Sequence, residues 1–225
     1  MIDINAKELF NLVNHQISNF WPGGAVPQES FFCLEKALSV LEDNFLRRSG
    51  APFQTNGIVT LNTKYTTQYM LFLYYYAHQL YLGGDEESAA TVYYLNKIMH
   101  ANDWFYAAEL PIHFGVEHGM NSVLGRAEYG DYLFIYQGVT IGGNRKDGKL
   151  VYPQLGNNVL LYSDSKVLGD TQIGNNVIIS ANSYLKDEKI PDNCSVFGSS
   201  PNIVIKQKSK EEIIDMTSHI WKFDE

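Results

Sequence analysis

The chain has little cysteine and no concentration of positive charge. Its 225 residues include two cysteines, Cys33 and Cys194, which lie far apart and form no Cys/His metal-binding pattern. With 17 basic against 25 acidic residues, the net charge of −8 argues against a surface for nucleic acid or anionic membrane. We therefore expect unpaired thiols in a reducing compartment, no nucleic-acid partner and no membrane partner.

The sequence also lacks a secretory signal and a long hydrophobic run. Residues 1–5 have acidic character and no basic region ahead of an apolar core. The longest apolar-looking stretch, from Tyr69 to Tyr76, is far too short to span a bilayer. These absences predict a soluble protein of the cytoplasm.

What the chain does have is a sixfold repeat of branched or long apolar residues. This period fits neither a helix nor a strand, but it is the repeat of a parallel β-helix whose triangular coil advances one side per hexapeptide. A β-sandwich would instead alternate with a period of two. The repeat residues, which we expect to point into the prism, are Val123, Tyr129, Ile135, Ile141, Leu155, Leu161, Val167, Ile173, Ile179 and Leu185. Because 14 positions separate Ile141 from Leu155, residues 142–154 should form a loop outside the prism.

The first 101 residues show helical periodicity, which predicts a separate α-helical domain for oligomerisation or as a cap. Helices are expected at roughly 4–20, 30–48, 64–83 and 86–101, with Asp85 as the N-cap of the last. The tyrosines around the third helix suggest packing in a core or an interface rather than a ligand site. The β-helix should occupy residues 102–206, and a tail at 207–225 should form a short helix at the prism's open end.

Two histidines, His113 and His118, fall in the predicted prism. His118 follows Glu117 in a run of polar and small residues, where an uninterrupted coil would be apolar. Asp103 lies 15 positions earlier, close to the 18 residues of one coil. We expect Asp103 and His118 to lie on adjacent coils near the same edge.

These segments resemble the serine acetyltransferases, which belong to the left-handed β-helix hexapeptide acyltransferases. Glu117-His118 is similar to the Asp-His pair that carries the family's catalytic base, and Asp103 falls at its second catalytic position. Residues 137–143, Gln-Gly-Val-Thr-Ile-Gly-Gly, match the segment before the family's extruded loop. Residues 198–201 resemble the turn that closes its β-helix.

The resemblance implies an α+β fold, with an N-terminal α-helical domain, a left-handed parallel β-helix and a short C-terminal helix. It also implies an acetyl-CoA-dependent O-acetyltransferase in which His118 is the general base, Asp103 orients it and Glu117 binds the acceptor, with no metal. Active sites shared between subunits would make the protein a homotrimer or a dimer of trimers. The residues implied to hold acetyl-CoA are Gly142, Gly143, Ser163, Ser180 and Ala181.

The sequence departs from the family in its loop and at its end. Val151-Tyr152-Pro153 replaces the family's Arg-His-Pro, so the basic pair that would bind an amino-acid carboxylate is missing. Tyr152 becomes an acceptor-binding candidate, because its ring can stack on a sugar. The acceptor is therefore either L-serine or a sugar hydroxyl. Residues 222–225 lack the family's terminal isoleucine, so we do not expect a complex with cysteine synthase.

Two other functions remain open. A zinc enzyme like the β-helix carbonic anhydrases would use His113 and His118, but its third histidine would have to come from the predicted helices. A non-catalytic trimeric scaffold would need neither Asp103 nor His118.

Overall fold

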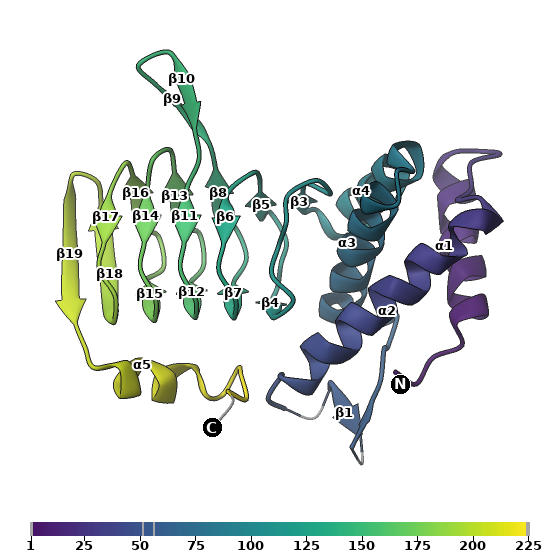
Figure 1. The fold of residues 1–225 in the computed structure, drawn as a ribbon, viewed down its shortest axis with the longest axis horizontal. Coiled ribbons are helices and arrows are strands. Elements are labelled where there is room, and N and C mark those ends of the chain that lie inside the picture. Colours follow the sequence, from purple (N-terminus) through teal and green to yellow (C-terminus); the bar gives the residue numbers. More distant parts are fainter. Residues whose placement is uncertain (1, 51, 56, 224–225) are drawn as a thin grey trace. The chain divides into compact units, whose positions relative to one another are not determined.

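The computed structural model describes residues 2–50, 52–55 and 57–223, which form two compact units, Met1–Ala101 and Asn102–Glu225 (Figure 1). The first unit is helical, close to the predicted ranges. No described helix has both the length and the apolar character needed to cross a membrane. The helices are α1 (Ala6–Phe20), η1 (Gln28–Ser30), α2 (Phe31–Leu46), α3 (Thr66–Leu82) and α4 (Glu86–His100), and two short strands, β1 (Gln54–Thr55) and β2 (Ile58–Val59), pair antiparallel.

The helix α3 is the core of the first unit. It is apolar on all sides, which is typical of a helix enclosed by other elements. Its tyrosines Tyr69, Tyr74 and Tyr76 are each at most 2% exposed, which confirms packing rather than a ligand platform. Asp85 caps α4 as predicted, because its carboxylate accepts a hydrogen bond from the Ser88 N–H.

The second unit is a left-handed parallel β-helix with three faces, as predicted. Each coil after the first supplies one short strand to each face, the first coil supplies strands to faces A and B only, and the strands stack in parallel from coil to coil (Figure 1). Face A consists of β3 (Asp103–Trp104), β5 (Val123–Leu124), β8 (Thr140–Gly142), β13 (Lys166–Leu168) and β16 (Tyr184–Lys186). Face B consists of β4 (Phe114–Val116), β7 (Leu133–Ile135), β12 (Val159–Leu161), β15 (Val177–Ile179) and the first part of β18 (Cys194–Ser199). Face C consists of β6 (Glu128–Tyr129), β11 (Gln154–Leu155), β14 (Gln172–Ile173) and β17 (Lys189–Ile190).

Three edges join these faces. The B–A edge comprises residues 117–122, 136–139, 162–165 and 180–183. The C–B edge comprises residues 113, 130–132, 156–158, 174–176 and 191–193, and the A–C edge comprises 125–127, 143–153, 169–171 and 187–188. The long strand β18 continues from face B to face A, and β19 (Asn202–Gln207) pairs antiparallel with it at the end of the prism.

The coil length explains where the predicted register held and where it failed. Val159 and Val177 pair 18 positions apart, whereas Glu128 and Gln154 pair 26 apart because the predicted loop intervenes as the hairpin β9 (Asn144–Lys146) and β10 (Lys149–Val151). In the upstream coil, the prediction that Val123 points into the prism was wrong by one residue. Val123 is 38% exposed and Leu124 is buried, because this coil contains 17 residues.

The C-terminal helix α5 (Lys210–Thr217) does not close the open end of the prism, contrary to the prediction. Figure 1 draws it alongside β15 and β12. The helix and the residues after it pack on the outside of face B, where the middle residues of β7, β12 and β15 are apolar and face outward. This cluster contains Phe134, Leu160, Ile178, Ile213, Ile220 and Trp221. Burial of this second apolar layer holds the tail on the flat face. The last two residues, Asp224 and Glu225, on which the expectation about cysteine synthase partly rests, lie outside the described residues.

Candidate functional site

Along the B–A edge, each coil stacks on the coil before it. Backbone hydrogen bonds link the coils there: the Gly138 N–H donates to Met120 O, Asp164 N–H to Gln137 O and Asn182 N–H to Ser163 O. The second residue after each face-B strand lies along this edge, and these four residues form what we call the column: His118, Gln137, Ser163 and Ala181. The last three are in register from coil to coil, whereas His118 lies in a larger corner opposite Gln137.

His118 differs from the rest of the column in its backbone and its exposure. Seven positions separate the end of β4 from the start of β5, whereas five separate β7 from β8, so the corner at His118 contains two additional residues. His118 is exposed and has a φ of 57°, in the left-handed region that few residues other than glycine adopt. Asn158 and Asn176 have the same conformation at ordinary corners of the prism, so the exposure of His118 and its enlarged corner, rather than its φ, set it apart. The corner thus presents an imidazole outward from a rigid prism.

Asp103 lies near the same edge but is not joined to His118. It begins β3 and pairs with Val123 on face A, and its N–H donates to Ser122 O over 2.8 Å. Glu117 continues the strand ladder through its N–H to Ile135 O. Among the described residues, no hydrogen bond joins the Asp103 carboxylate to the His118 imidazole. The predicted trio shares one corner of the prism without forming a hydrogen-bonded relay.

The residues predicted to hold acetyl-CoA divide between two edges. Ser163, Ser180 and Ala181 lie on the B–A edge, in the coils beyond His118. Gly142 ends β8, and Gly143 follows it at the opposite edge of face A, where the hairpin begins. Face A therefore separates the two groups within one chain.

Gly142 and Gly143 differ in what surrounds them. A Cβ at Gly143 would lie 2.7 Å from Cδ1 of Tyr152, so this glycine is required for the tyrosine ring to pack at the base of the hairpin. A Cβ at Gly142 would meet nothing within 4 Å. The space beside Gly142 is open to a ligand, whereas Gly143 sets the position of Tyr152.

The hairpin charges are partly used within the protein. Lys146 Nζ lies 2.9 Å from Oδ2 of Asp170 on the next coil, and both side chains are almost half exposed. The hydrogen bond to Asp170 and the neighbouring acidic charges raise the pKa of Lys146. Arg145 donates to the Gly148 carbonyl within the hairpin, over 3.4 Å. The hairpin carries three cationic side chains, Arg145, Lys146 and Lys149, and Lys146 is thus paired with the prism.

His113 occupies the C–B edge, at the other end of β4 from His118. Its Nδ1 lies 2.7 Å from Oδ2 of Asp131, and its ring stacks on Tyr132 with 4.7 Å between centroids. Burial alone would raise the pKa of Asp131, but the hydrogen bond and charge of His113 lower it. The part of the chain that the structure describes holds no group of three or more metal-binding side chains. The two histidines of the zinc alternative lie at opposite ends of β4, on different edges.

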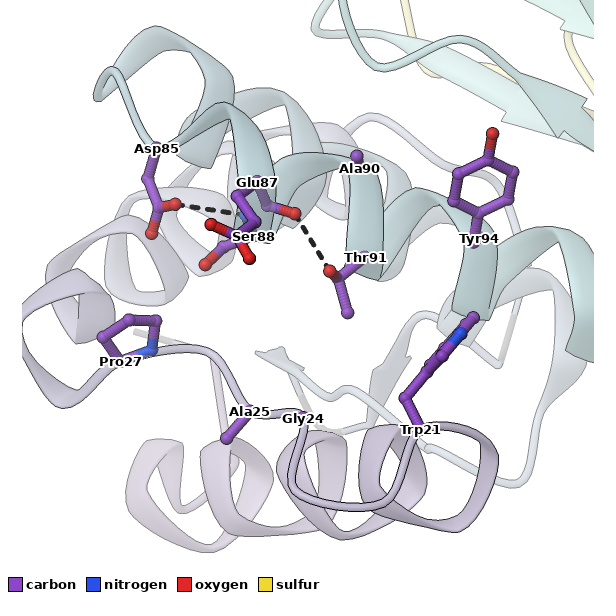
Figure 2. Close-up of a pocket in the computed structure, with 10 residues that line it drawn as sticks. All are labelled: Trp21, Gly24, Ala25, Pro27, Asp85, Glu87, Ser88, Ala90, Thr91 and Tyr94. Carbon is purple, nitrogen blue, oxygen red and sulfur yellow. Dashed lines mark hydrogen bonds between the residues drawn. The ribbon is translucent and has the colours of Figure 1, made fainter.

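A pocket of about 520 Å³ lies elsewhere, within the helical unit (Figure 2). It is bounded by the chain between α1 and α2 and by the first half of α4, with Trp21 and Tyr94 at one end and Asp85 at the other (Figure 2). The Asp85 carboxylate is already used as the cap of α4. None of the predicted site residues lines this pocket.

Comparison with known proteins places the chain in a family. The model for "Bacterial transferase hexapeptide (six repeats)" matches residues 152–187. A serine acetyltransferase of Synechococcus elongatus is 40% identical over 101 residues, covering 44% of this chain and 41% of that protein. A serine acetyltransferase of Staphylococcus epidermidis is 32% identical over 149 residues, covering 66% of this chain and 69% of that protein. The chain belongs to the serine acetyltransferase family.

The family fold extends over nearly the whole chain. A serine acetyltransferase of Brucella abortus, solved in complex with coenzyme A, superposes with a TM-score of 0.65 at 22% identity and covers 89% of this chain and 83% of that one. The helices followed by a β-helix are therefore the arrangement of this family.

One polar residue of the B–A edge received no role from the sequence. Gln137 belongs to the family-like segment 137–143, but its place opposite the His118 corner follows only from the stacking of the coils. Counting two residues beyond each predicted face-B strand would have found it. The signal was the position in the repeat rather than the residue type.

Proposed function

We propose that this member of the serine acetyltransferase family transfers the acetyl group of acetyl-CoA to an acceptor hydroxyl, with His118 as the general base. The observation that carries the proposal is the exposed, left-handed His118 at the enlarged corner of the B–A edge. The names of the Synechococcus and Staphylococcus relatives support this chemistry.

The transfer needs no covalent enzyme intermediate, because the thioester already has a good leaving group. The neutral His118 imidazole accepts the proton of the acceptor hydroxyl as its oxygen attacks the thioester carbonyl carbon. A C–O bond forms and the C–S bond then breaks, and the imidazolium returns the proton to the departing sulfur. The products are an acetyl ester and free CoA.

Asp103 and Glu117 would support this base. In the proposal, Asp103 turns toward His118 once substrates are bound, orienting the imidazole and stabilising its cation. Hydrogen bonds of catalytic groups are often long or unformed before the substrates bind. Glu117, directly before His118, would contact the acceptor.

Acetyl-CoA is the proposed donor, and the complex of the Brucella abortus relative with coenzyme A supports it. Ser163, Ser180 and Ala181 lie on one edge of face A, and Gly142 and Gly143 lie on the other. A ligand that touches both groups would have to cross face A or lie between two neighbouring chains. A trimer would bring the B–A edge of one subunit to the A–C edge of the next. A homotrimer, alone or as a dimer of trimers, is therefore part of the proposal.

The acceptor is either L-serine or a sugar hydroxyl. The names of the relatives favour serine. The base of the hairpin favours a sugar, because Tyr152 packs on Gly143 and is 36% exposed, where the family carries a basic pair. An exposed aromatic ring stacks on a sugar but offers no cation to a carboxylate.

Free-thiol release from acetyl-CoA tests the proposal, with L-serine and a panel of sugars and nucleotide sugars as acceptors. Acceptor-dependent release is expected from the wild-type chain, and the acceptor that supports it decides between the two classes. Release that is no faster with any acceptor than with water would contradict the acetyltransferase proposal and favour the scaffold.

A further inference from the structure

Gln137 is the neighbour of His118 on the next coil. The Glu117 N–H donates to Ile135 O over 3.0 Å, and the Gly138 N–H donates to Met120 O over 2.9 Å. These two backbone bonds enclose residues 118–120 of one coil and residues 136–137 of the next, so Gln137 lies opposite the enlarged corner that contains His118. Adjacent strands are separated by about 4.8 Å, a step that a glutamine side chain can span.

The Gln137 carboxamide is not used by the fold. Its Oε1 is enclosed and makes no hydrogen bond, and no side-chain hydrogen bond from its Nε2 exists among the described residues. An enclosed amide oxygen without a partner costs stability, and the fold makes no compensating use of this side chain. Rotation of the terminal amide can present its N–H groups to the surface.

The other residues of the column cannot take the same role. Ser163 and Ala181 have short side chains and lie one and two coils further from His118. Gly138 has no side chain, and a Cβ there would lie 2.1 Å from Oδ1 of Asp164. Gln137 is the one residue of this column, beside the base, that carries a long hydrogen-bond donor.

We propose that Gln137 is the oxyanion donor of the transfer, with its Nε2 donating a hydrogen bond to the thioester carbonyl oxygen of acetyl-CoA. This inference rests on the proposed function. When the acceptor oxygen bonds to the carbonyl carbon, the electron pair of the C=O bond moves to that oxygen, and it returns as the C–S bond breaks. The attacked carbon must lie within reach of an acceptor hydroxyl that is hydrogen-bonded to His118, so a donor on the coil opposite this corner is placed to meet the carbonyl oxygen.

The test compares Gln137→Ala and Gln137→Met with wild type in steady-state thiol release, using the acceptor that wild type turns over fastest. Both variants should lower kcat by about 10²-fold, the effect of removing one oxyanion donor. Binding of CoA, which lacks the acetyl carbonyl, should be unchanged. The thermal midpoint should stay level or rise, because an unpartnered buried amide has been removed.

Gln172→Ala is the matched control, since this glutamine is exposed on face C and should keep the wild-type kcat. A wild-type kcat in both Gln137 variants would overturn the inference. So would a loss of activity that merely follows a fall in the thermal midpoint or in CoA affinity. His118→Ala, run in parallel, separates the two claims: if it is inactive while the Gln137 variants are active, only the oxyanion assignment fails. A wild-type protein without acceptor-dependent turnover would overturn both.

Discussion

His113 and His118 flank the same short strand, β4, but the edges on which they lie are built differently. On the C–B edge, each coil uses its polar side chains to hold the next. The backbone N–H of Asp131 donates to the side chain of Asn157, that of Asn157 to Asn175 and that of Asn175 to Asp192. His113 continues this ladder through Asp131.

The B–A edge differs at the corner of His118. This corner is enlarged by two residues, His118 is exposed whereas the His113 side chain is mostly buried, and Oε1 of Gln137 makes no hydrogen bond. Left-handed backbone and an enclosed oxygen without a partner also occur on the C–B edge, at Asn158, so the exposure and the enlarged corner carry the contrast. Polar groups that satisfy one another maintain the fold, whereas polar groups left unsatisfied on a rigid edge are available to a ligand. From the difference between the two edges we propose a structural role for His113 and a chemical role for His118.

The largest expected loss of stability comes from the glycine stack of the C–B edge. A Cβ at Gly156 would lie 2.7 Å from the backbone carbon and oxygen of Gly174, so Gly156→Ala forces two coils apart. We expect the free energy of unfolding to fall by about 3 kcal/mol. Denaturant unfolding measures it.

Gly142→Ala is the matched variant on face A, since its Cβ would meet nothing within 4 Å. It should leave stability unchanged and raise the KM for acetyl-CoA if the ligand approaches there. Equal destabilisation by the two variants would contradict the account of the stack.

The second effect concerns His113. Removal of its imidazole by His113→Ala leaves the partly exposed Asp131 without its partner and removes the stacking on Tyr132. The free energy of unfolding should fall by about 1 kcal/mol, while kcat for thiol release stays at the wild-type value. A loss of kcat with unchanged stability would reverse the roles assigned to the two histidines.

A smaller effect is the pH dependence that Asp131, on the C–B edge, gives to the stability of the fold. The folded-state pKa of Asp131 is lowered, so its ionised form stabilises the fold above the ordinary carboxyl range. That contribution begins to decrease once the pH falls below about 4, where Asp131 becomes protonated in the unfolded chain. It is lost completely once the pH is below the lower pKa of Asp131 in the folded state. The stability difference between wild type and Asp131→Asn should be constant near neutral pH and shrink in acid. A difference that grew in acid would contradict this sign.

The smallest effect is expected at the A–C edge, where Lys146 pairs with Asp170 in solvent. Lys146→Ala should change the thermal midpoint only slightly, and less still in high salt, because exposed ion pairs are screened. A large, salt-independent fall would show that the pair fixes the hairpin on the prism.

Much of the β-helix could be predicted from its period of six. The inward residues from Ile135 onward and the extruded hairpin follow from counting, because stacked coils require a constant number of residues. The register failed at Val123, where the coil contains 17 residues and no sequence signal marks the missing one. The helix α5 was predicted, but its place on face B was not. The neglected signal was the outward apolar residue of successive strands, Phe134, Leu160 and Ile178.

The site was less accessible to sequence reasoning. The family-like motifs predicted which residues to consider, but they could not show that the residues proposed to hold acetyl-CoA divide between two edges. Nor could spacing show that Asp103 and His118 share a corner without a hydrogen bond, since side-chain orientation depends on the enlarged turn.

The most direct test of the account is acceptor-dependent thiol release from acetyl-CoA by wild type, His118→Ala and His113→Ala, each shown to have the same circular dichroism spectrum and oligomeric state. We expect His118→Ala to lose about 10²–10⁴-fold in kcat and His113→Ala to retain the wild-type value. Full turnover by a well-folded His118→Ala protein would contradict the assignment of the base and, with it, the contrast between the two edges.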